Sequence, residues 1–522
     1  MHFLTIEQMR NAELAAAATG GFPLMLLMRR AGVALAAAAA RLANLRNTRK
    51  VVLVAGHGNN GGDACVAARC LHEDGFRAHA LLTCAPDALR GDAHTAWDEM
   101  HAAGVPCSVL DTPESWDSAD SPSQMLLGRP CIVVDGILGS GCKGAPSGVA
   151  ERAIRWVNQM RGPALVVSAD LPSGVNGDTG EMPGAAVHAD ATVTFGRPKP
   201  CFISDAVARL SGHLEVADLG LPPALCDAAP ADTPCGLIAL PELRAAFPPR
   251  PWDAHKGTCG HICVLGGSSA YPHAPVLAAL GALKSGAGLV TLAVPQHSAF
   301  AAAAWAPEAT LSALVAPQGT LTRSSLAPIA ETTFDAMVIG PGLTQGHDAA
   351  ELVACLLSTP GTRIVLDADG LNALAQLHEA RAWRPRDGQQ LSLTPHPGEA
   401  ARLLGCTVAD IQRDRLRAVR LLADTFRATV VLKGAGTLVC APGGVPLLNR
   451  TGNPGMATGG TGDVLAGMVA ALWAQNGDSV RAAAAAVWAH GAAGDAAAFS
   501  GAQTSLTATT LARHLPSAFQ ML

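Results

Sequence analysis

The chain of 522 residues exceeds what one hydrophobic core usually supports, so we expect two domains. Hydrophobic residues make up 49% of the sequence and charged residues 15%, a balance that is typical of globular proteins and excludes intrinsic disorder. The formal net charge of −5 excludes a broadly basic protein, so we expect no nucleic-acid partner.

The N-terminal region predicts neither a membrane segment nor a signal peptide. Its longest apolar stretch, residues 31–40, is too short to span a membrane. Glu7, Arg10 and Glu13 interrupt the apolar core that a signal peptide requires. The fourteen cysteines include no CxxC pair, which is typical of a reducing compartment. We therefore predict a cytoplasmic protein without a membrane partner.

Strands and helices are predicted to alternate in the first half. Alanine-rich helices are expected over residues 5–44, with a break at Gly20–Pro23. The strands that follow are predicted at residues 51–55, 78–83, 131–135 and 164–169, and the helices near 64–74, 88–103 and 148–160. This alternation predicts a doubly wound, Rossmann-like parallel sheet.

Three polar loops directly follow predicted strands of the first half. They are Gly56–Asp63 (GHGNNGGD), the glycine-rich loop that begins at Asp135, and the loop that begins at Asp170. Ligands bind beyond the carboxyl ends of the strands in open parallel sheets, so we expect the loops to converge on one crevice. Their glycines would cradle phosphates, and their carboxylates would serve a cation or proton transfer. For a single such loop a tight structural turn is the favoured alternative, but three in register favour a site.

The first half resembles a known family through four motifs in order: GHGNNGGD, VVDGILGSG, SADLPSGVNGDTG and TFGRPKP. They resemble the NAD(P)H-hydrate epimerase domain, also called the YjeF N-terminal domain, over residues 1–227. The resemblance implies hydrate contacts at Asn59, Asn60, Gly61, Gly62, Asp63, Gly139, Ser140, Gly141, Cys142, Lys143, Gly144, Ala145 and Asp170. It implies K⁺ ligands at Asn60, Asp135 and Ser173, an oxygen-only set that suits a hard, weakly held cation. Epimerisation at C6 of the hydrated nicotinamide needs an acid or base, for which Asp170 is our candidate and Lys199 a second participant.

A second α/β pattern follows a proline-rich segment at residues 221–234, which predicts a domain boundary. We place it so that the domains comprise residues 1–227 and 228–522. The strands of the second domain are predicted at residues 261–265, 289–294, 336–339, 363–366, 390–394, 429–432 and 437–440. Alanine-rich helices lie between them, and the last is predicted at residues 479–499.

Two glycine loops of the second half indicate phosphoryl transfer. Lys433–Thr437 (KGAGT) directly follows a predicted strand, and Gly459–Asp463 opens a predicted helix. Glycine N–H groups and a helix N-terminus neutralise developing charge, and Asp463 would orient and deprotonate a hydroxyl. The alternative for Asp463 is a carboxylate that only stabilises the helix dipole. His396, between two prolines, is predicted to contact a ligand.

The second half resembles the ADP-dependent NAD(P)H-hydrate dehydratase, the YjeF C-terminal domain. The motifs are HKGTCGHICVLGGS, GPGL, LDADGLNAL, TPHPGE, KGAGT and GGTGDVLAG, in the family's order. The resemblance implies a ribokinase-like α/β fold with hydrate contacts at Ala274, Gly342, His396 and Asp463. It implies nucleotide contacts at Lys433, Gly434, Ala435, Gly436, Thr437 and Gly462. The sequence departs from the family at His273 and Thr344, both at positions that are usually glycine.

Together the two resemblances imply a bifunctional repair enzyme that acts on hydrated NADH and NADPH. The first domain interconverts the R and S hydrates. The second transfers phosphate from ADP to the hydroxyl of the S form, and elimination then restores NADH or NADPH and leaves AMP and phosphate. Mg²⁺ with ADP in the second domain and K⁺ in the first are the expected cofactors, and a homo-oligomer is expected. The alternatives are a ribokinase-like small-molecule kinase fused to a nucleotide-binding domain, and a first domain that only binds metabolites or proteins.

Overall fold

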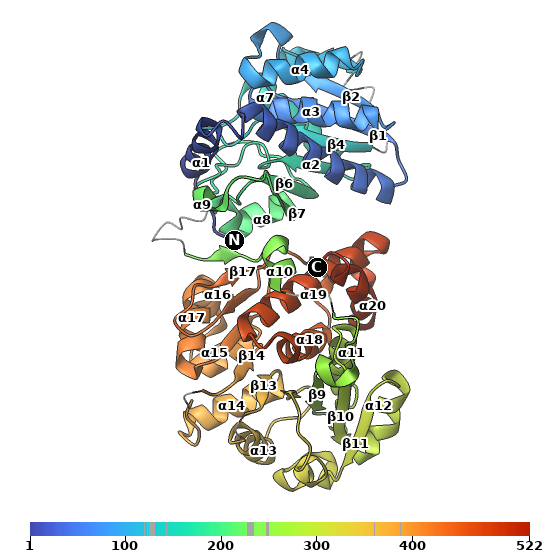
Figure 1. Ribbon diagram of the computed structural model, residues 1–522, viewed down its shortest axis with the longest axis vertical. Coiled ribbons are helices and arrows are strands. Elements are labelled where there is room, and N and C mark those ends of the chain that lie inside the picture. Colours follow the sequence, from blue (N-terminus) through green and yellow to red (C-terminus); the bar gives the residue numbers. More distant parts are fainter. Residues whose placement is uncertain are drawn as a thin grey trace. The chain divides into compact units, whose positions relative to one another are not determined.

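The computed structural model describes residues 1–118, 121–122, 124, 131–141, 144–226, 234–246, 250–359, 361–386 and 388–522. The chain divides into two compact units, Met1–Thr233 (unit 1) and Pro234–Leu522 (unit 2), coloured blue to green and green to red in Figure 1. Both units are α/β with mainly parallel sheets, which confirms the predicted fold class. The predicted boundary at residue 228 lies outside the described residues and stays a prediction.

Unit 1 contains a parallel sheet with the strand order β3-β2-β1-β4-β5-β6-β7 among the described residues. Its strands are β1 (Lys50–Ala55), β2 (Arg77–Leu82), β3 (Cys107–Val109), β4 (Cys131–Gly136), β5 (Ala164–Ala169), β6 (Ala191–Phe195) and β7 (His213–Ala217). The order reverses between β1 and β4, because the sheet grows from β1 in both directions. Beyond the carboxyl ends of the strands at such a reversal lies the usual ligand crevice of a doubly wound sheet.

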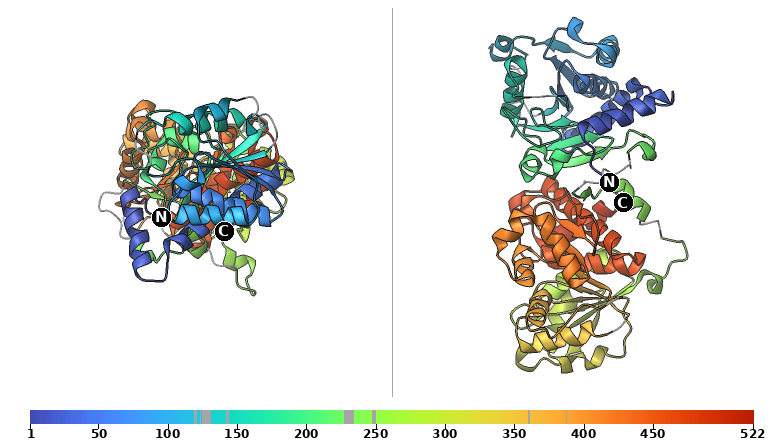
Figure 2. Two further views of the ribbon diagram at one scale, coloured as in Figure 1. Left: turned by 90° about the horizontal axis from the view of Figure 1, so that it is seen from above. Right: turned by 90° about the vertical axis from the view of Figure 1, so that its left-hand side faces the viewer.

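Helices cover both faces of this sheet (Figures 1 and 2). They are α1 (Ile6–Ala18), α2 (Leu24–Leu45), α3 (Asn59–Glu73), α4 (Gly91–Ala102), α5 (Pro113–Asp117), α7 (Gly148–Met160), α8 (Asp205–Ser211) and α9 (Pro223–Cys226). Val51 and Leu53 of β1 pack into the core formed with α2, α3 and α4. Val52 and Val54, which point to the opposite face, pack into the core formed with α7. Burial on both faces explains why β1 is an uninterrupted apolar run.

Unit 2 contains a larger sheet, with the order β11-β10-β9-β12-β13-β14-β15-β16-β17-β8 among the described residues. Its strands are β8 (Gly236–Leu237), β9 (His261–Leu265), β10 (Leu289–Pro295), β11 (Thr310–Leu314), β12 (Ala336–Ile339), β13 (Arg363–Leu366), β14 (Leu391–Leu393), β15 (Thr429–Leu432), β16 (Leu438–Cys440) and β17 (Leu447–Leu448). All neighbours from β11 to β15 are parallel, whereas β16 is antiparallel to both of its neighbours. The loops after β9 and β12 to β15 therefore lie at one edge of the sheet.

The helices of unit 2 bury both faces of its sheet. They are α10 (Leu240–Ala246), α11 (Ala274–Lys284), α12 (Ala299–Trp305), α13 (His347–Leu357), α14 (Asp369–Glu379), α15 (Pro397–Leu404), α16 (Val408–Arg413), α17 (Arg415–Phe426), α18 (Thr461–Asn476), α19 (Ser479–Ser500) and α20 (Ala508–Phe519). Two glycines let α11 and α18 touch through their backbones. A Cβ on Gly467 would lie 1.8 Å from the carbonyl oxygen of Ala278, and one on Gly281 would lie 2.1 Å from that of Val464.

Most predicted elements are confirmed, and β9, β12, β13, β15 and α7 match their predicted ranges residue for residue. Three differences matter. α20 follows the helix that was predicted to be the last, so that prediction is wrong. The strands β3, β6, β7, β8, β11 and β17 were not predicted. Finally, α3 begins at Asn59, five residues before the predicted start, so part of the first glycine loop is helical.

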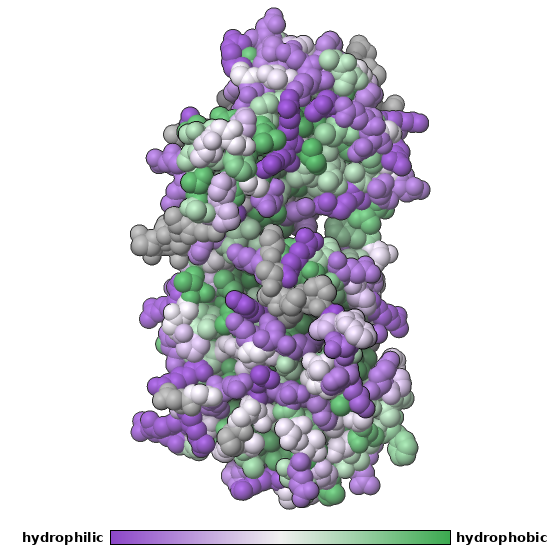
Figure 3. Space-filling model, in the orientation of Figure 1, coloured by the Kyte–Doolittle hydropathy of each residue, from purple (hydrophilic) through white to green (hydrophobic). Residues whose placement is uncertain are grey.

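The surface is mixed in character. On the face drawn in Figure 3, hydrophilic residues are interspersed with apolar ones in both units. Among the described residues, no helix combines the length and the hydropathy that crossing a membrane requires.

Candidate active sites

The structure brings the three polar loops of unit 1 together at the carboxyl ends of β1, β4 and β5. Asn60, in the first turn of α3, donates from Nδ2 to the carbonyl oxygen of Ala169 at 2.7 Å, at the end of β5. Gly139 lies so close that a Cβ there would be 2.3 Å from Oδ1 of Asn60. Gly56 in turn lies against Ile137, with 1.9 Å between its Cβ position and the carbonyl oxygen. Because a Cβ would clash at both positions, only glycine allows these segments to approach so closely.

Two glycines of the predicted phosphate cradle also have a packing role. Gly61 and Gly62 are buried inside α3. A Cβ on Gly61 would lie 1.9 Å from the carbonyl oxygen of Gly56, and one on Gly62 would lie 2.7 Å from Sδ of Met28. They allow close packing of α3, and their predicted contact with the hydrate stays a prediction.

The loop after β4 is only partly described. Cys142 and Lys143 of the predicted contact set lie outside the described residues. Gly141 and Gly144 are exposed, and a Cβ on either would meet open space. These two glycines of the loop are therefore open to solvent.

Asp135, at the end of β4, is fully buried and is surrounded by donors. Its carboxylate accepts from the Ser173 hydroxyl at 2.5 Å, the Ser168 hydroxyl at 2.8 Å, the Ser173 amide at 2.9 Å and the Ile137 amide at 3.3 Å. Burial raises the pKa of Asp135, and these hydrogen bonds oppose the rise. The arrangement fixes the loops after β4 and β5 to each other.

The predicted cation ligands lie within this network. Ser173 contacts both Asp135 and the backbone of Leu138, whose carbonyl oxygen is 3.1 Å from the Ser173 hydroxyl. Asn60 donates to the same Leu138 carbonyl at 3.4 Å and to that of Ala169. Carboxylate, hydroxyl, amide and carbonyl oxygens thus gather in one place. This donor set fits a hard cation such as K⁺.

Asp170 follows β5 in a left-handed backbone conformation, with φ +61°. This conformation is strained for most residues but is more accessible to Asp and Asn. Its amide donates to the Val193 carbonyl at 2.8 Å. Its Oδ1 accepts from the Thr194 hydroxyl at 3.1 Å, from the Phe195 amide at 3.3 Å and from the ammonium of Lys199. No described residue donates to Oδ2, which is therefore the oxygen left for a ligand.

Two further acids share the charge of Lys199, which is only 3% exposed. Burial raises the pKa of Asp63 well above its usual value, and the charges of Asp170 and Glu13 raise it further against the opposing effect of Lys199. Burial also raises the pKa of Glu13, which Lys199 opposes. Three carboxyl groups around one ammonium favour a proton on Asp63, beside Asp170, which is paired with Lys199. Acid–base chemistry at carbon needs such a pair.

Glu13 was not predicted to belong to this site. It lies one helical turn after Met9 on α1, and a Cβ on Gly196 would be 2.4 Å from Cε of Met9. Leu4 donates to the carbonyl oxygen of Pro198 at 3.0 Å. These contacts seat α1 on the loop that carries Lys199. The available sequence signal was an acid on an alanine-rich helix with a buried face.

The second candidate site lies at the carboxyl edge of the sheet in unit 2. Gly267 donates to the Pro341 carbonyl at 2.8 Å, which joins the loops after β9 and β12. A Cβ on Gly342 would be 2.6 Å from the Tyr271 carbonyl oxygen and 3.2 Å from Cβ of Ala274. The structure thus brings the predicted substrate contacts Ala274 and Gly342 side by side.

The two departures from the family pattern are accommodated in different ways. His273 precedes the first residue of α11 with a negative φ of −102°, so it needs no glycine. Thr344 adopts a positive φ of +67°, a conformation that a β-branched residue rarely takes. Its amide donates to Oδ2 of Asp369 at 2.9 Å, which holds the strained residue in place.

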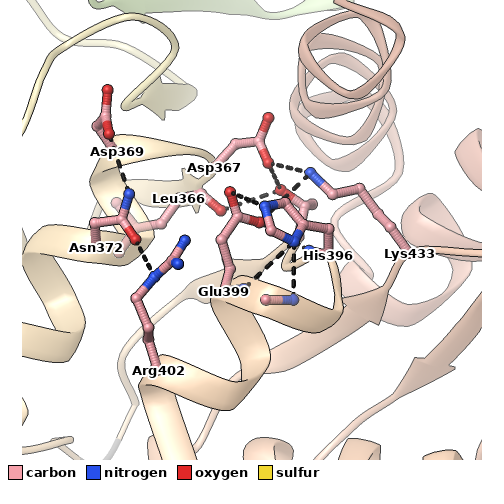
Figure 4. Close-up of polar contacts among 10 residues, drawn as sticks. Leu366, Asp367, Asp369, Asn372, His396, Glu399, Arg402 and Lys433 are labelled. Carbon is pink, nitrogen blue, oxygen red and sulfur yellow. Dashed lines mark hydrogen bonds and ion pairs between the residues drawn. The ribbon is translucent and has the colours of Figure 1, made fainter. Parts of the chain in front are cut away.

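Lys433 lies between two buried acids, as Figure 4 shows. Its Nζ is 2.7 Å from Oδ1 of Asp367 and 3.9 Å from Oε2 of Glu399. The Thr394 hydroxyl donates to the same oxygen of Asp367 at 2.8 Å. Burial alone would lower the pKa of Lys433, but Asp367 and Glu399 outweigh it and hold that pKa above its usual value.

Asp463 lies in the first turn of α18, next to this cluster. A Cβ on Gly462 would lie 3.2 Å from Nζ of Lys433. Burial raises the pKa of Asp463 to about 8, helped by the charge of Asp367 and opposed by Lys433. Burial likewise raises the pKa of Glu399 to about 7 against the effect of Lys433. A carboxyl group that titrates near neutral pH suits a general base.

His396 has a structural role in addition to its predicted ligand contact. Its Nδ1 accepts from the amides of Gly398 at 2.9 Å and Glu399 at 3.4 Å, which caps the start of α15. Its Nε2 is 3.3 Å from Oε1 of Glu399, and its amide donates to Oε2 at 2.8 Å. Burial and the charge of Lys433 lower the pKa of His396. The neutral ring therefore holds Glu399 in the site, and its contact with a ligand stays a prediction.

The predicted nucleotide loop, Lys433–Thr437, is held by a guanidinium group. Arg415 donates to the carbonyl oxygens of Gly436 at 3.1 Å and Leu432 at 3.2 Å, and to that of Lys433 at 3.4 Å. Gly434 and Ala435 at the tip are exposed. The loop is thus fixed at its base and open at its tip.

Asp367 and Glu399 were part of quoted motifs but were not predicted as site residues. A buried acid directly after a strand, and a second one in the first turn of α15, were the signals that could have found them. A further chain of hydrogen bonds runs from Asp369 through Asn372 to Arg402, at 3.1 and 2.8 Å (Figure 4). Among the described residues, no group of three or more His, Cys, Asp or Glu side chains is arranged to hold a metal ion by itself.

Comparisons with known proteins agree with this division of the chain. The family model described as "YjeF-related protein N-terminus" matches residues 25–201, and the one described as "NAD(P)H-hydrate dehydratase" matches residues 262–517. The chain is 38% identical to the bifunctional NAD(P)H-hydrate repair enzyme Nnr of Moorella thermoacetica, over 99% of this chain and 96% of that protein. It is 37% identical to the enzyme of the same name from Coxiella burnetii, over 94% and 93%. Among solved structures, the ADP/ATP-dependent NAD(P)H-hydrate dehydratase from Bacillus subtilis, co-crystallized with ATP/Mg²⁺, is 31% identical over 55% of this chain and 98% of that chain, with a TM-score of 0.48.

Proposed function

Because the chain belongs to the family of bifunctional NAD(P)H-hydrate repair enzymes, we propose that it restores hydrated NADH and NADPH in two steps, one in each unit. Unit 1 interconverts the R and S hydrates, and unit 2 dehydrates the S form with ADP. The observation that carries this proposal is the Lys433 cluster beside Asp463, at the N-terminus of a helix in the unit that matches the dehydratase model. Full-length relatives with the repair activity disfavour a small-molecule kinase.

In unit 1, Asp170 exchanges the proton at the reacting centre of the hydrate. Its free Oδ2 faces the ligand, while Lys199 and Thr194 hold Oδ1. Asp63 supplies the protonated partner. K⁺ would be held by Asn60, Asp135 and Ser173, and its charge would offset the phosphates of the hydrate.

In unit 2, Asp463 takes the proton from the hydroxyl of the S hydrate. The hydroxyl oxygen forms a bond to the terminal phosphorus of ADP as the bond to AMP breaks. The Gly462 amide and the ammonium of Lys433 stabilise the charge on the transferred group. The C–O bond then breaks, phosphate leaves, and loss of a ring proton restores the double bond.

Mg²⁺ would bind beside the same cluster of Lys433, Asp367 and Glu399. The clustered carboxyl oxygens of Asp367 and Glu399 are ligands that Mg²⁺ prefers, together with phosphate. Bound there, Mg²⁺ would neutralise part of the charge on the phosphates of the nucleotide. A cytoplasmic homo-oligomer is part of the proposal, and exposed apolar side chains beside the edge strand β11, such as Phe300 at 91% and Trp305 at 60%, support the oligomer.

Two variants of the full chain test the assignment of one step to each unit. With ADP and a mixture of R and S hydrates, the unaltered protein should restore the whole reduced-nicotinamide absorbance. Asp463→Asn should lose dehydration by about 10²-fold or more, yet keep epimerisation and nucleotide binding. Asp170→Asn should restore only the S fraction rapidly, because it lacks the epimerase step.

The exposed acids Asp74 and Asp253 provide matched controls, since their Asn variants should keep both activities. Asparagine also tolerates the backbone conformation of Asp170, so this variant changes the chemistry with little added strain. If the unaltered protein restores no absorbance, the dehydratase proposal is wrong. Full-rate epimerisation by Asp170→Asn would refute the role of that acid.

A further inference from the structure

One side of α19 packs against the segment that leads into Asp463, here called the entry segment (residues 449–463). The residues that form this side are His490, Gly491, Gly494 and Asp495. Their spacing places them on neighbouring turns of the helix. None of them belongs to the site described above, yet each contacts the entry segment.

His490 holds the C-terminal end of the entry segment. Its Nε2 lies 2.8 Å from the carbonyl oxygen of Thr461, and a carbonyl only accepts, so Nε2 carries the hydrogen. Burial lowers the pKa of His490 to about 4, so the ring is neutral at physiological pH. The Thr461 hydroxyl in turn donates to the carbonyl oxygens of Met456 and Thr458, both at 3.1 Å. His490 is thus linked to the turn that ends at Asp463.

The two glycines let the entry segment lie directly on the backbone of α19. A Cβ on Gly491 would lie 2.2 Å from Oγ1 of Thr451, and one on Gly494 would lie 2.3 Å from Sδ of Met456. The Thr451 hydroxyl also donates to the carbonyl oxygen of Trp488 at 2.9 Å. Any larger residue at these two positions would displace the segment.

Asp495 holds the middle of the entry segment. One carboxylate oxygen accepts from the Gly452 amide at 2.9 Å, and the other accepts from Nδ2 of Asn453 at 3.0 Å. Asn453 passes the constraint on, because its Oδ1 accepts from the Gly455 amide at 3.0 Å. Both ends of the bend before α18 are therefore tied to one rigid helix.

We propose that His490 and Asp495 are positioning residues for the dehydration reaction, which hold the entry segment so that Gly462 and the carboxyl group of Asp463 lie beside Lys433. This inference rests on the proposed function of unit 2. A small misplacement of a reacting group costs a large part of the rate, so these distant contacts bear on catalysis. They do not touch Lys433–Thr437, which holds five of the six predicted nucleotide contacts, so nucleotide binding should depend on them much less than kcat does.

The test compares two substitutions of His490 in the full chain. The side-chain amide of glutamine can donate from about the position of Nε2, whereas leucine fills similar space and donates nothing. His490→Gln should keep kcat for dehydration within about threefold, while His490→Leu should lower it by about 10²-fold, the loss expected for a displaced reacting group. KM for ADP should change much less than kcat in both. Asp495→Asn should likewise lower kcat for dehydration much more than it changes KM for ADP, because its side-chain amide cannot accept from both Gly452 and Asn453.

His514 on α20 provides the matched control, because it is a partly exposed histidine outside this contact. His514→Gln and His514→Leu should leave kcat unchanged, and epimerisation by unit 1 serves as an internal reference for each preparation. Equal losses in His490→Gln and His490→Leu, or an unchanged kcat in His490→Leu, would overturn the positioning role. If His490→Leu does not fold, Asp495→Asn replaces it in the test, and an unchanged kcat in that variant would overturn the positioning role. An unaltered protein without dehydration would instead refute the proposed function itself.

Discussion

The environment of Asp463 destabilises its ionised form, which is the form that its proposed role as a general base requires. Burial and the nearby Asp367 carboxylate disfavour its ionised form, and one ammonium does not offset both effects. The raised pKa also makes the carboxylate a stronger base once it is ionised, which suits this group to proton transfer near neutral pH. Stability and reactivity therefore depend on the same group.

We predict that Asp463→Asn stabilises unit 2 while it abolishes dehydration. The unfolded chain ionises Asp463 near its ordinary pKa, but the folded state does so only at about 8, so the folded state binds the proton more tightly between these values. Raising the pH through this window therefore removes stability from the unaltered protein and not from the variant. Thermal unfolding at several pH values should show that the melting temperature of the variant exceeds that of the unaltered protein by an amount that grows towards pH 8. A difference that is independent of pH would contradict the raised pKa.

The site residues differ in how far the sequence could predict them. Lys433 and Asp463 sit in glycine motifs whose chemistry is readable from local spacing. The pair of Lys433 and Asp367, by contrast, joins residues 66 positions apart, and only the order of the strands brings them together. Glu13 was missed for a similar reason, since its place above Lys199 depends on how α1 packs. Local sequence patterns could not predict the charge interactions between residues that are far apart in the sequence.

At the scale of the elements, most β-strands buried on both faces were readily predicted. The buried strand β6 was missed because Thr192 and Thr194 interrupt its apolar run. Strands such as β9 and β12 are continuous apolar runs, which the sequence displays directly. The edge strand β11 is mostly exposed and β7 only half-buried, so neither carries such a run. The early start of α3 was missed because Gly61 and Gly62 have low helix propensity, which close packing overrides.

The backbone contact between α11 and α18 leads to a prediction about stability. Gly467→Ala would normally favour a helix, but its new methyl group would meet the Ala278 carbonyl oxygen at 1.8 Å. We expect the variant to lower the free energy of unfolding by about 1–3 kcal/mol, as overpacking does. Chemical denaturation measures this. Gly459→Ala, whose Cβ meets open space, is the control and should change stability little; equal effects of the two would contradict the contact.

At the scale of the whole molecule, each unit has its own sheet and its own core. We therefore predict that fragments 1–227 and 228–522, expressed separately, each fold and keep epimerisation and dehydration respectively. Activity assays and cooperative unfolding of each fragment check this. Loss of either activity on separation would contradict the independence of the units.

The place of the cut matters for unit 2. β8 begins at Gly236 and pairs with β17 at the edge of the sheet. A fragment that starts at residue 240 would lack β8 and expose the edge of β17, a surface that promotes aggregation. It should therefore be less stable and less well behaved than fragment 228–522. Equal behaviour of the two would show that β8 is dispensable.

The left-handed backbone at Asp170 bears on how this family can diverge. Asparagine and glycine accept the conformation most readily among the alternatives, and neither carries a carboxylate. A lineage that loses the acid therefore has no gradual route through glutamate or another acid. In a related sequence, the residue at this position should separate chains that retain proton exchange from those that kept only the fold and its ligand.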